Sequence, residues 1–211
     1  MRKQKHAAMM LIILAFLLCM ICGCNEQNNP SPTESLQELL EKTLLIDSVS
    51  YAVEIATPML DTTTTAQVWQ KTLYLKQQET TVAGNISTTQ TIIKRPEGLY
   101  RYNEEQQSYE QDPQAILPQP TLQDMATDLL TNQTLTRLGI ETIDGKTTTV
   151  IQYNPKETGN STTMTLWIWN ENAVPLKAEH ITIYEETSII TQYTYTSYSF
   201  EEIPDSVFYV E

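Results

Sequence analysis

The spacing of hydrophobic residues changes from a helical period to a strand-like period near residue 45. Between Ser35 and Leu45 the leucines are three or four residues apart, which predicts an amphipathic helix that Thr33 or Ser35 can cap. From Val49 onward apolar and polar residues alternate, which predicts a half-buried strand. The chain therefore begins its globular part with one helix and continues as strands.

Strand-like segments separated by turn residues follow almost to the C-terminus. The predicted strands are 66–76, 87–95, 99–103, 107–111, 135–143, 146–153, 162–169, 176–184, 188–200 and 207–210. Asp61–Thr65 is expected to be a loop, Asp144-Gly145 is a strong hairpin turn signal, and Leu122–Leu130 can form a short helix capped by Thr121.

These elements predict a mainly β (α+β) fold. About eight to ten strands in sequential antiparallel hairpins would form one strongly bent half-barrel sheet. The N-terminal helix and the inserted short helix are expected to cover its concave side.

The first 23 residues have the character of a signal peptide. A basic leader precedes the uncharged apolar run Ala7–Met20, and about 14 residues span only ~21 Å as a helix, short of the ~30 Å hydrocarbon core. Ile21-Cys22-Gly23-Cys24 resembles the lipobox of prokaryotic lipoproteins. That resemblance implies that Cys24 is lipidated and becomes the first residue of the mature protein. The alternative is an uncleaved signal anchor.

The lipobox divides the chain into a signal peptide (1–23), a polar tether (24–34) and one domain (35–211). A lipid anchor would hold the domain on the outer face of the cell membrane, or in the periplasm or on the outer membrane of a two-membrane cell. All three cysteines precede Asn25, so the mature domain has no disulfide, cysteine nucleophile or thiolate metal site.

The charge balance limits the partners. Lys and Arg total 13 and Asp and Glu total 26, for a net charge of −13. A chain this acidic is not suited to nucleic acid or to an anionic membrane face. An apolar or neutral ligand, or a protein partner, stays possible.

Catalytic and metal-binding patterns are not found. His180 is the single histidine after the signal peptide, the sequence contains no G-x-S-x-G elbow, and acidic pairs fall in predicted turns. We predict no catalytic residue, cofactor or metal site. A hydrolase is the remaining enzymatic alternative, and it would depend on His180. Three N-x-S/T sequons are possible glycosylation sites, at Asn85, Asn132 and Asn160.

Several stretches resemble the lipoprotein carrier LolA and its LolB-, LppX- and RseB-type relatives. They are Lys94-Arg95-Pro96 followed by Tyr100 and Tyr102, the turn Val174–Glu179, and the terminal Phe200–Phe208. The resemblance implies an open half-barrel with helices as a lid over a cavity that shelters acyl chains, and a role for Arg95 in holding that lid. The chain departs from the family after Tyr102, where the family's next hairpin motif is missing, and in its lipid anchor.

We therefore expect a non-enzymatic, membrane-anchored protein that binds lipid or an acylated ligand. Burial of a 14-carbon chain offers on the order of 10 kcal/mol before ordering costs. Alternation along the strands selects the candidate lining residues Val53, Ile55, Trp69, Leu73, Met164, Leu166, Ile168, Ile181 and Ile183, to which the resemblance adds Arg95. The alternative is a sensor or protein-interaction module of the same fold with no bound ligand.

Overall fold

One antiparallel sheet of eleven strands forms the framework of the protein. The computed structural model describes residues 35–117, 119–131, 133–155, 161–185 and 187–210. The predicted signal peptide, the tether, Cys24, Asn132 and Asn160 lie outside these residues.

The strands follow one another as hairpins, with a single long-range pairing. They are β1 (Ser48–Thr57), β2 (Thr62–Lys71), β3 (Tyr74–Ala83), β4 (Ile86–Arg95), β5 (Gly98–Asn103), β6 (Ser108–Gln111), β7 (Thr136–Ile143), β8 (Lys146–Tyr153), β9 (Ser161–Trp169), β10 (Val174–Tyr184) and β11 (Thr187–Ser199). The order across the sheet is β6-β5-β4-β3-β2-β1-β11-β10-β9-β8-β7. The first and last strands therefore join two meanders in the middle of the sheet.

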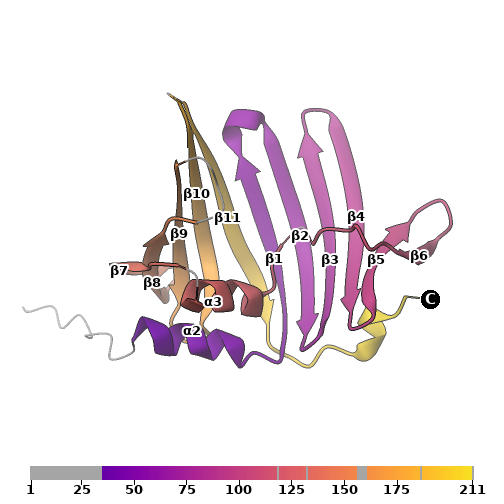
Figure 1. The fold of residues 1–211 in the computed structure, drawn as a ribbon, viewed down its shortest axis with the longest axis horizontal. Helices are drawn as coiled ribbons and strands as arrows, with labels where there is room; N and C mark the ends of the chain where they lie inside the picture. The colour runs from indigo at the N-terminus through magenta and orange to yellow at the C-terminus, as the bar shows by residue number, and fades with distance from the viewer. Residues whose placement is uncertain (1–34, 118, 132, 156–160, 186, 211) are drawn as a thin grey trace, which may run out of the picture. The chain divides into compact units, whose positions relative to one another are not determined.

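Two α-helices lie on one face of this sheet (Figure 1). α2 (Leu36–Leu44) begins at Ser35, whose hydroxyl accepts a hydrogen bond from the Glu38 N–H while the Glu38 carboxylate accepts one from the Ser35 N–H. α3 (Leu122–Thr131) begins after Thr121, whose hydroxyl accepts from the Asp124 N–H at 2.9 Å. Both helices begin where the sequence predicts.

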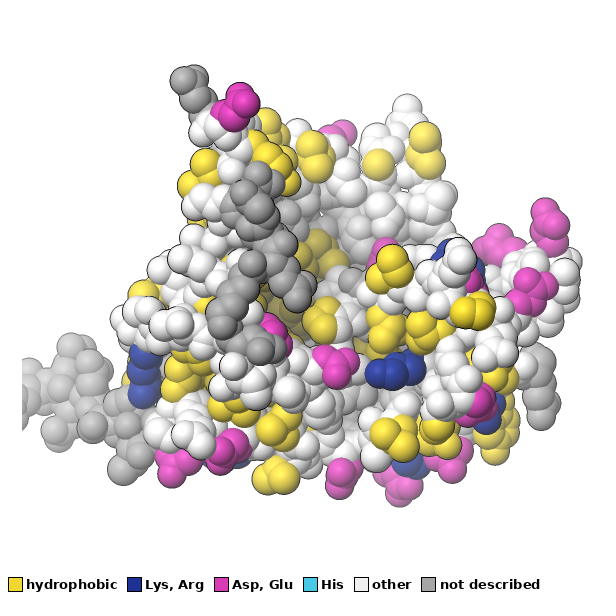
Figure 2. Space-filling model, in the orientation of Figure 1, with side chains coloured by type: hydrophobic (Ala, Val, Ile, Leu, Met, Phe, Trp, Pro, Cys, Tyr) yellow, Lys and Arg dark blue, Asp and Glu magenta, His cyan; other side chains and the backbone are white. Residues whose placement is uncertain are grey.

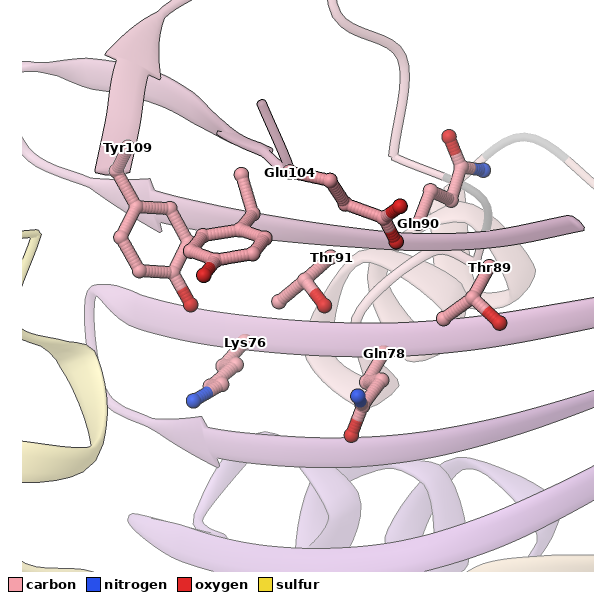
Figure 3. A pocket seen from close by; sticks show the side chains of 8 residues that line it. Lys76, Gln78, Thr89, Gln90, Thr91, Glu104 and Tyr109 are labelled. Carbon is pink, nitrogen blue, oxygen red and sulfur yellow. The ribbon is translucent and has the colours of Figure 1, made fainter. Parts of the chain in front are cut away.

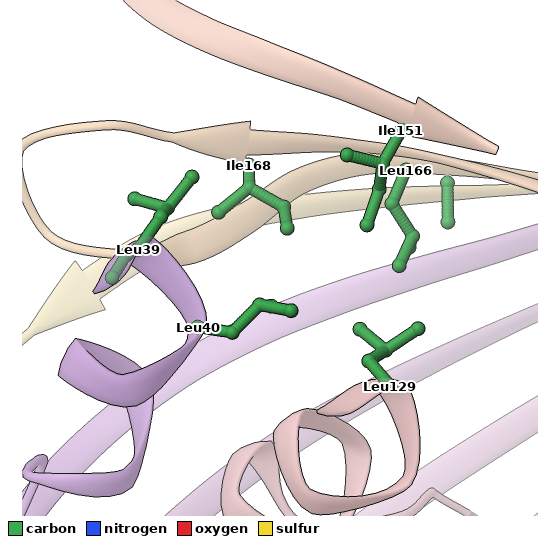
Figure 4. Close-up of a cluster of buried hydrophobic side chains, with 8 residues drawn as sticks. Leu39, Leu40, Leu129, Ile151, Leu166 and Ile168 are labelled. Atoms are coloured by element: carbon green, nitrogen blue, oxygen red, sulfur yellow. The ribbon is translucent and has the colours of Figure 1, made fainter. Parts of the chain in front are cut away.

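The helices bury their apolar sides against the strands. Leu39 and Leu40 of α2 and Leu129 of α3 meet Ile151, Leu166 and Ile168 of β8 and β9 (Figure 4). The opposite face has a smaller cluster, in which Ile93 packs with Ile203 and Phe208 of the C-terminal segment. The mainly β, antiparallel fold with an N-terminal and an inserted helix is confirmed. The strong bend stays a prediction.

Three predicted elements are wrong. Segment 66–76 is not one strand, because Thr72 adopts a left-handed backbone (φ 47°) and reverses the chain between β2 and β3. The predicted loop Asp61–Thr65 is mostly strand, since Thr64 pairs with Thr81 and their hydroxyls are hydrogen-bonded at 2.9 Å. The predicted last strand is instead the 3₁₀ turn η2 (Asp205–Phe208), which places Phe208 in the core.

Candidate functional site

The helix-facing side of the sheet carries two continuous rows of side chains across β8, β9, β10, β11 and β1. Strand register places one residue of each strand beside the next. The lower row is Ile151, Leu166, Ala178, Tyr193 and Ile55. The upper row is Tyr153, Met164, His180, Thr191 and Thr57, where Thr57 and Thr191 are joined by a 3.1 Å hydroxyl contact.

Over β8–β10 the helices cover residues of the lower row and the neighbouring Ile168. Leu166 and Ile168, both predicted to line a cavity, are 3% and 1% exposed under Leu39, Leu40 and Leu129. Helix side chains therefore occupy this part of the face, and a ligand would not reach these two residues without displacing a helix.

Above the helices the same face is only partly covered. Ile55, Met164, Tyr153 and Tyr193 are half-buried there. Figure 2 shows apolar side chains on this face and a recess near the middle of the sheet. We name these four residues the upper surface. It contains predicted lining residues from β1 and β9 and two tyrosines that the prediction left out.

None of the four side chains of the upper surface carries a charge at neutral pH. Burial raises the pKa of Tyr153 to about 12, with a further contribution from Asp128, and burial raises the pKa of Tyr193. Burial also lowers the pKa of His180 below its ordinary value of 6.5. At neutral pH the surface therefore offers rings, aliphatic groups and uncharged hydrogen-bonding groups.

His180 makes the stability of the domain depend on pH. Because its pKa is lowered on folding, the unfolded chain takes up the proton first as the pH falls below about 6.5, and folding stability is lost through that range. We expect the melting temperature to fall less between pH 7.5 and pH 5.5 in His180→Gln than in the unchanged protein. An equal fall in both, measured by thermal unfolding in the two buffers, would contradict this.

Buried glutamines hold the segment that crosses this face. The segment 112–121, described except for residue 118, runs across the strands from β6 to α3 (Figure 1). The Gln77 amide donates to the Gln119 carbonyl at 2.8 Å and accepts from the Gln119 N–H at 3.1 Å. Gln70 accepts from the Leu122 N–H at 3.2 Å and donates to the Gln123 side chain. Gln70 and Gln77 are each 1% exposed, so these contacts are shielded from water.

Arg95 does not take part in these contacts. Its guanidinium pairs with Glu97 at 2.7 Å, and it shares the face of β4 that carries Ile93, opposite the helices. The lid role that the resemblance implied for Arg95 stays a prediction, while the hydrogen bonds to the crossing segment and to α3 come from Gln70 and Gln77.

The remaining predicted residues are divided between the two faces. Val53 lies on the helix-facing side and is 2% exposed. Trp69, Ile181 and Ile183 lie on the opposite face. Leu73 is in the β2–β3 turn and is 63% exposed, and Asn85 is exposed in the β3–β4 turn.

The described residues show neither a metal centre nor a membrane-spanning helix. Within them, His, Cys, Asp and Glu side chains form no group of three or more that could hold a metal ion. In the same part of the chain, none of the helices has the length and apolar character needed to span a bilayer.

Comparisons with known proteins give matches by structure alone. No protein-family model matches the sequence, and no curated protein matches it. An uncharacterized conserved protein from Thermus thermophilus matches with a TM-score of 0.56 at 11% identity, over 83% of this chain and 93% of that one. MucB in the MucA/MucB complex of Pseudomonas aeruginosa matches with a TM-score of 0.52 at 11% identity, over 83% of this chain.

The match to the MucA/MucB structure is partial, since it covers 60% of that chain. A LolA superfamily protein from Nitrosomonas europaea scores 0.40 at 18% identity, over 83% of this chain and 98% of that one, which is too low a score to conclude a common fold. The described domain is thus similar in fold to the Thermus protein and to part of the Pseudomonas MucB structure.

Proposed function

We propose that the protein is a lipid-anchored, extracytoplasmic binding protein without enzymatic activity, and that it receives a lipid or acyl chain on the upper surface. One observation carries this proposal: the helices cover only part of the helix-facing side and leave half-buried Ile55, Met164, Tyr153 and Tyr193 beside it. Half-buried apolar groups gain free energy when an apolar ligand completes their burial.

The chemistry of the upper surface agrees with an acyl chain. Each buried methylene is worth about 0.8 kcal/mol. Apart from the neutral His180, the two rows contain no acidic or basic side chain, so binding an acyl chain would not remove water from a charged group there. Threonine and tyrosine hydroxyls at the edges of the rows can bond a polar head group. The lipobox supplies the location, since lipidated Cys24 would place the domain outside the cytoplasm.

The test compares two isoleucines on opposite faces of the sheet. Protein purified from its own membranes is analysed by native mass spectrometry for lipid bound in addition to the anchor. We expect Ile55→Asn to remove most of this lipid, because a polar amide would then face the chain. Ile183→Asn, on the opposite face, should retain it. Absence of lipid from the unchanged protein, or equal retention by both variants, would contradict the proposal.

A second candidate function, a protein-interaction module, is favoured by the ends of three hairpins. The β1–β2, β3–β4 and β10–β11 connections lie at the same end of the sheet (Figure 1). They expose six apolar side chains, between 39% and 70%: Met59, Leu60, Val82, Ile86, Ile183 and Ile190. We name them the tip patch. Apolar groups gathered in this way are typical of interaction sites.

The tip patch lies away from the chain end that enters the domain. α2 contacts the β9–β10 connection, where the Thr43 hydroxyl donates to the Ala173 carbonyl at 2.6 Å, and this connection is at the opposite end of the sheet. MucB, which is similar in fold, has been solved in a complex with MucA. A protein partner could therefore meet the tip patch at the end of the sheet opposite α2.

The interaction candidate is tested by crosslinking on intact cells. Leu60→Asp should abolish a crosslinked complex, because the new carboxylate would be buried in the interface. Leu45→Asp introduces the same charge at an exposed leucine next to α2 and should leave the complex intact. Crosslinks that survive Leu60→Asp would exclude the tip patch as the contact.

A further inference from the structure

The face of the sheet opposite the helices has a separate polar cavity of about 270 Å³. Its floor is made by Lys76 and Gln78 of β3 and by Thr91 of β4, and register places Gln78 beside Thr91 (Figure 3). The hairpin β5–β6 supplies Tyr102, Glu104 and Tyr109 as a wall. No residue of the upper surface takes part in it.

The aromatic wall is fixed in place. Tyr102 and Tyr109 are directly opposite each other on β5 and β6, and their rings meet at 5.1 Å between centroids at an angle of 61°. The Tyr102 hydroxyl donates to the Gln107 side chain at 3.0 Å. The two rings therefore form an ordered apolar surface beside a polar floor.

The polar lining selects a class of ligand. The positive charge of the Lys76 ammonium and the negative charge of the Glu104 carboxylate cancel. The cavity therefore has no net charge that would favour an anion or a cation. The amide of Gln78 and the hydroxyl of Thr91 both donate and accept. An acyl chain would bury these groups without partners and is excluded on this ground.

We propose that this cavity binds one neutral sugar ring. A pyranose has an apolar C–H face that can lie on a tyrosine ring and hydroxyls on its edge that both donate and accept hydrogen bonds, which matches the wall and the floor. The volume of about 270 Å³ is just below the 300–1,000 Å³ of drug-sized sites and so suits a single ring.

The proposal goes beyond acyl-chain binding and does not depend on it, because the two sites are on opposite faces. Ile55→Asn should remove lipid and leave sugar binding unchanged. A failure of the sugar test would likewise leave the lipid test unaffected.

The experiment is saturation-transfer NMR on the full-length protein in a detergent without a sugar head group. The probes are methyl β-D-glucopyranoside, methyl β-D-galactopyranoside and methyl N-acetyl-β-D-glucosaminide. We expect at least one to bind with a dissociation constant in the millimolar range. Tyr109→Ala and Gln78→Ala should each weaken binding by about tenfold. Tyr184→Ala, which removes an exposed tyrosine from β10, should have no effect.

The outcomes decide the proposal. Circular dichroism checks that the β5–β6 hairpin survives Tyr109→Ala, and the exposed position of Gln78 makes Gln78→Ala a test that does not risk the fold. The proposal would be overturned if none of the three glycosides showed transfer up to about 50 mM, or if transfer were equal in both cavity variants and the unchanged protein. Tighter binding of butyrate or alanine than of a glycoside would also overturn it.

Discussion

Leu40→Ala is expected to lower the free energy of unfolding of the domain by about 3–4 kcal/mol. Leu40 is 0% exposed and lies in the cluster that joins α2 to α3 and to β8 and β9. The truncation removes apolar burial and leaves a cavity that two helices on a rigid sheet cannot close. For a domain of this size, the melting temperature should fall by about 10 °C.

Leu45 provides a matched control at the C-terminal end of the same helix. It is the C-cap of α2 and is 78% exposed, so Leu45→Ala should change the unfolding free energy by less than about 0.5 kcal/mol. Both variants are compared by urea unfolding of the full-length protein. Equal losses would mean that α2 does not pack on the sheet through the side that carries Leu40.

Cys24→Ser should abolish the lipid anchor. A serine hydroxyl cannot form the thioether that joins the diacylglyceryl group to the lipobox cysteine, and two acyl chains are what hold such a protein stably on a bilayer. Metabolic labelling with a radioactive fatty acid should drop to background. In phase partitioning, the protein should move from the detergent phase to the aqueous phase. Alternatively, the variant should accumulate as an unprocessed precursor.

The neighbouring cysteine supplies the control for this experiment. Cys22→Ser keeps a small residue at that position of the Ile21–Cys24 motif, so acylation of Cys24 and membrane retention should continue. Absence of fatty-acid label from the unchanged protein, with Cys24→Ser equal to it in size and in membrane retention, would instead support the uncleaved signal anchor, which needs no thioether.

Local sequence signals were sufficient for most elements. Asp144 and Gly145 both adopt positive φ, 48° and 77°, and the strand after them spans 146–153 as predicted. Ser35 and Thr121 cap the two helices for the same local reason. The threonines of early β2 were missed because they show no alternation. They become a strand through pairing with β1 on one side and β3 on the other, which a short window does not contain.

The site was less predictable because alternation divides a strand into two sets of residues without saying which set faces the helices. In β2 the polar Gln70 faces α3, where Leu122 and Gln123 satisfy its amide, while the larger Trp69 packs on the opposite face. Phe208 and Ile203, which come from the far end of the sequence, cover that face. Partners distant in the chain therefore decide the orientation.

The seam between the first and last strands has a consequence for how the molecule can be divided. Every other strand pairing joins neighbours in the sequence, whereas β1 and β11 bring Val53 against Tyr195. We therefore expect each meander to form before the two meet and the seam to close last. We expect two separately produced pieces, divided near residue 118, to reassemble when they are mixed. Recovery of a cooperative thermal unfolding transition in the mixture would show the reassembly. The protein could then serve as a split reporter.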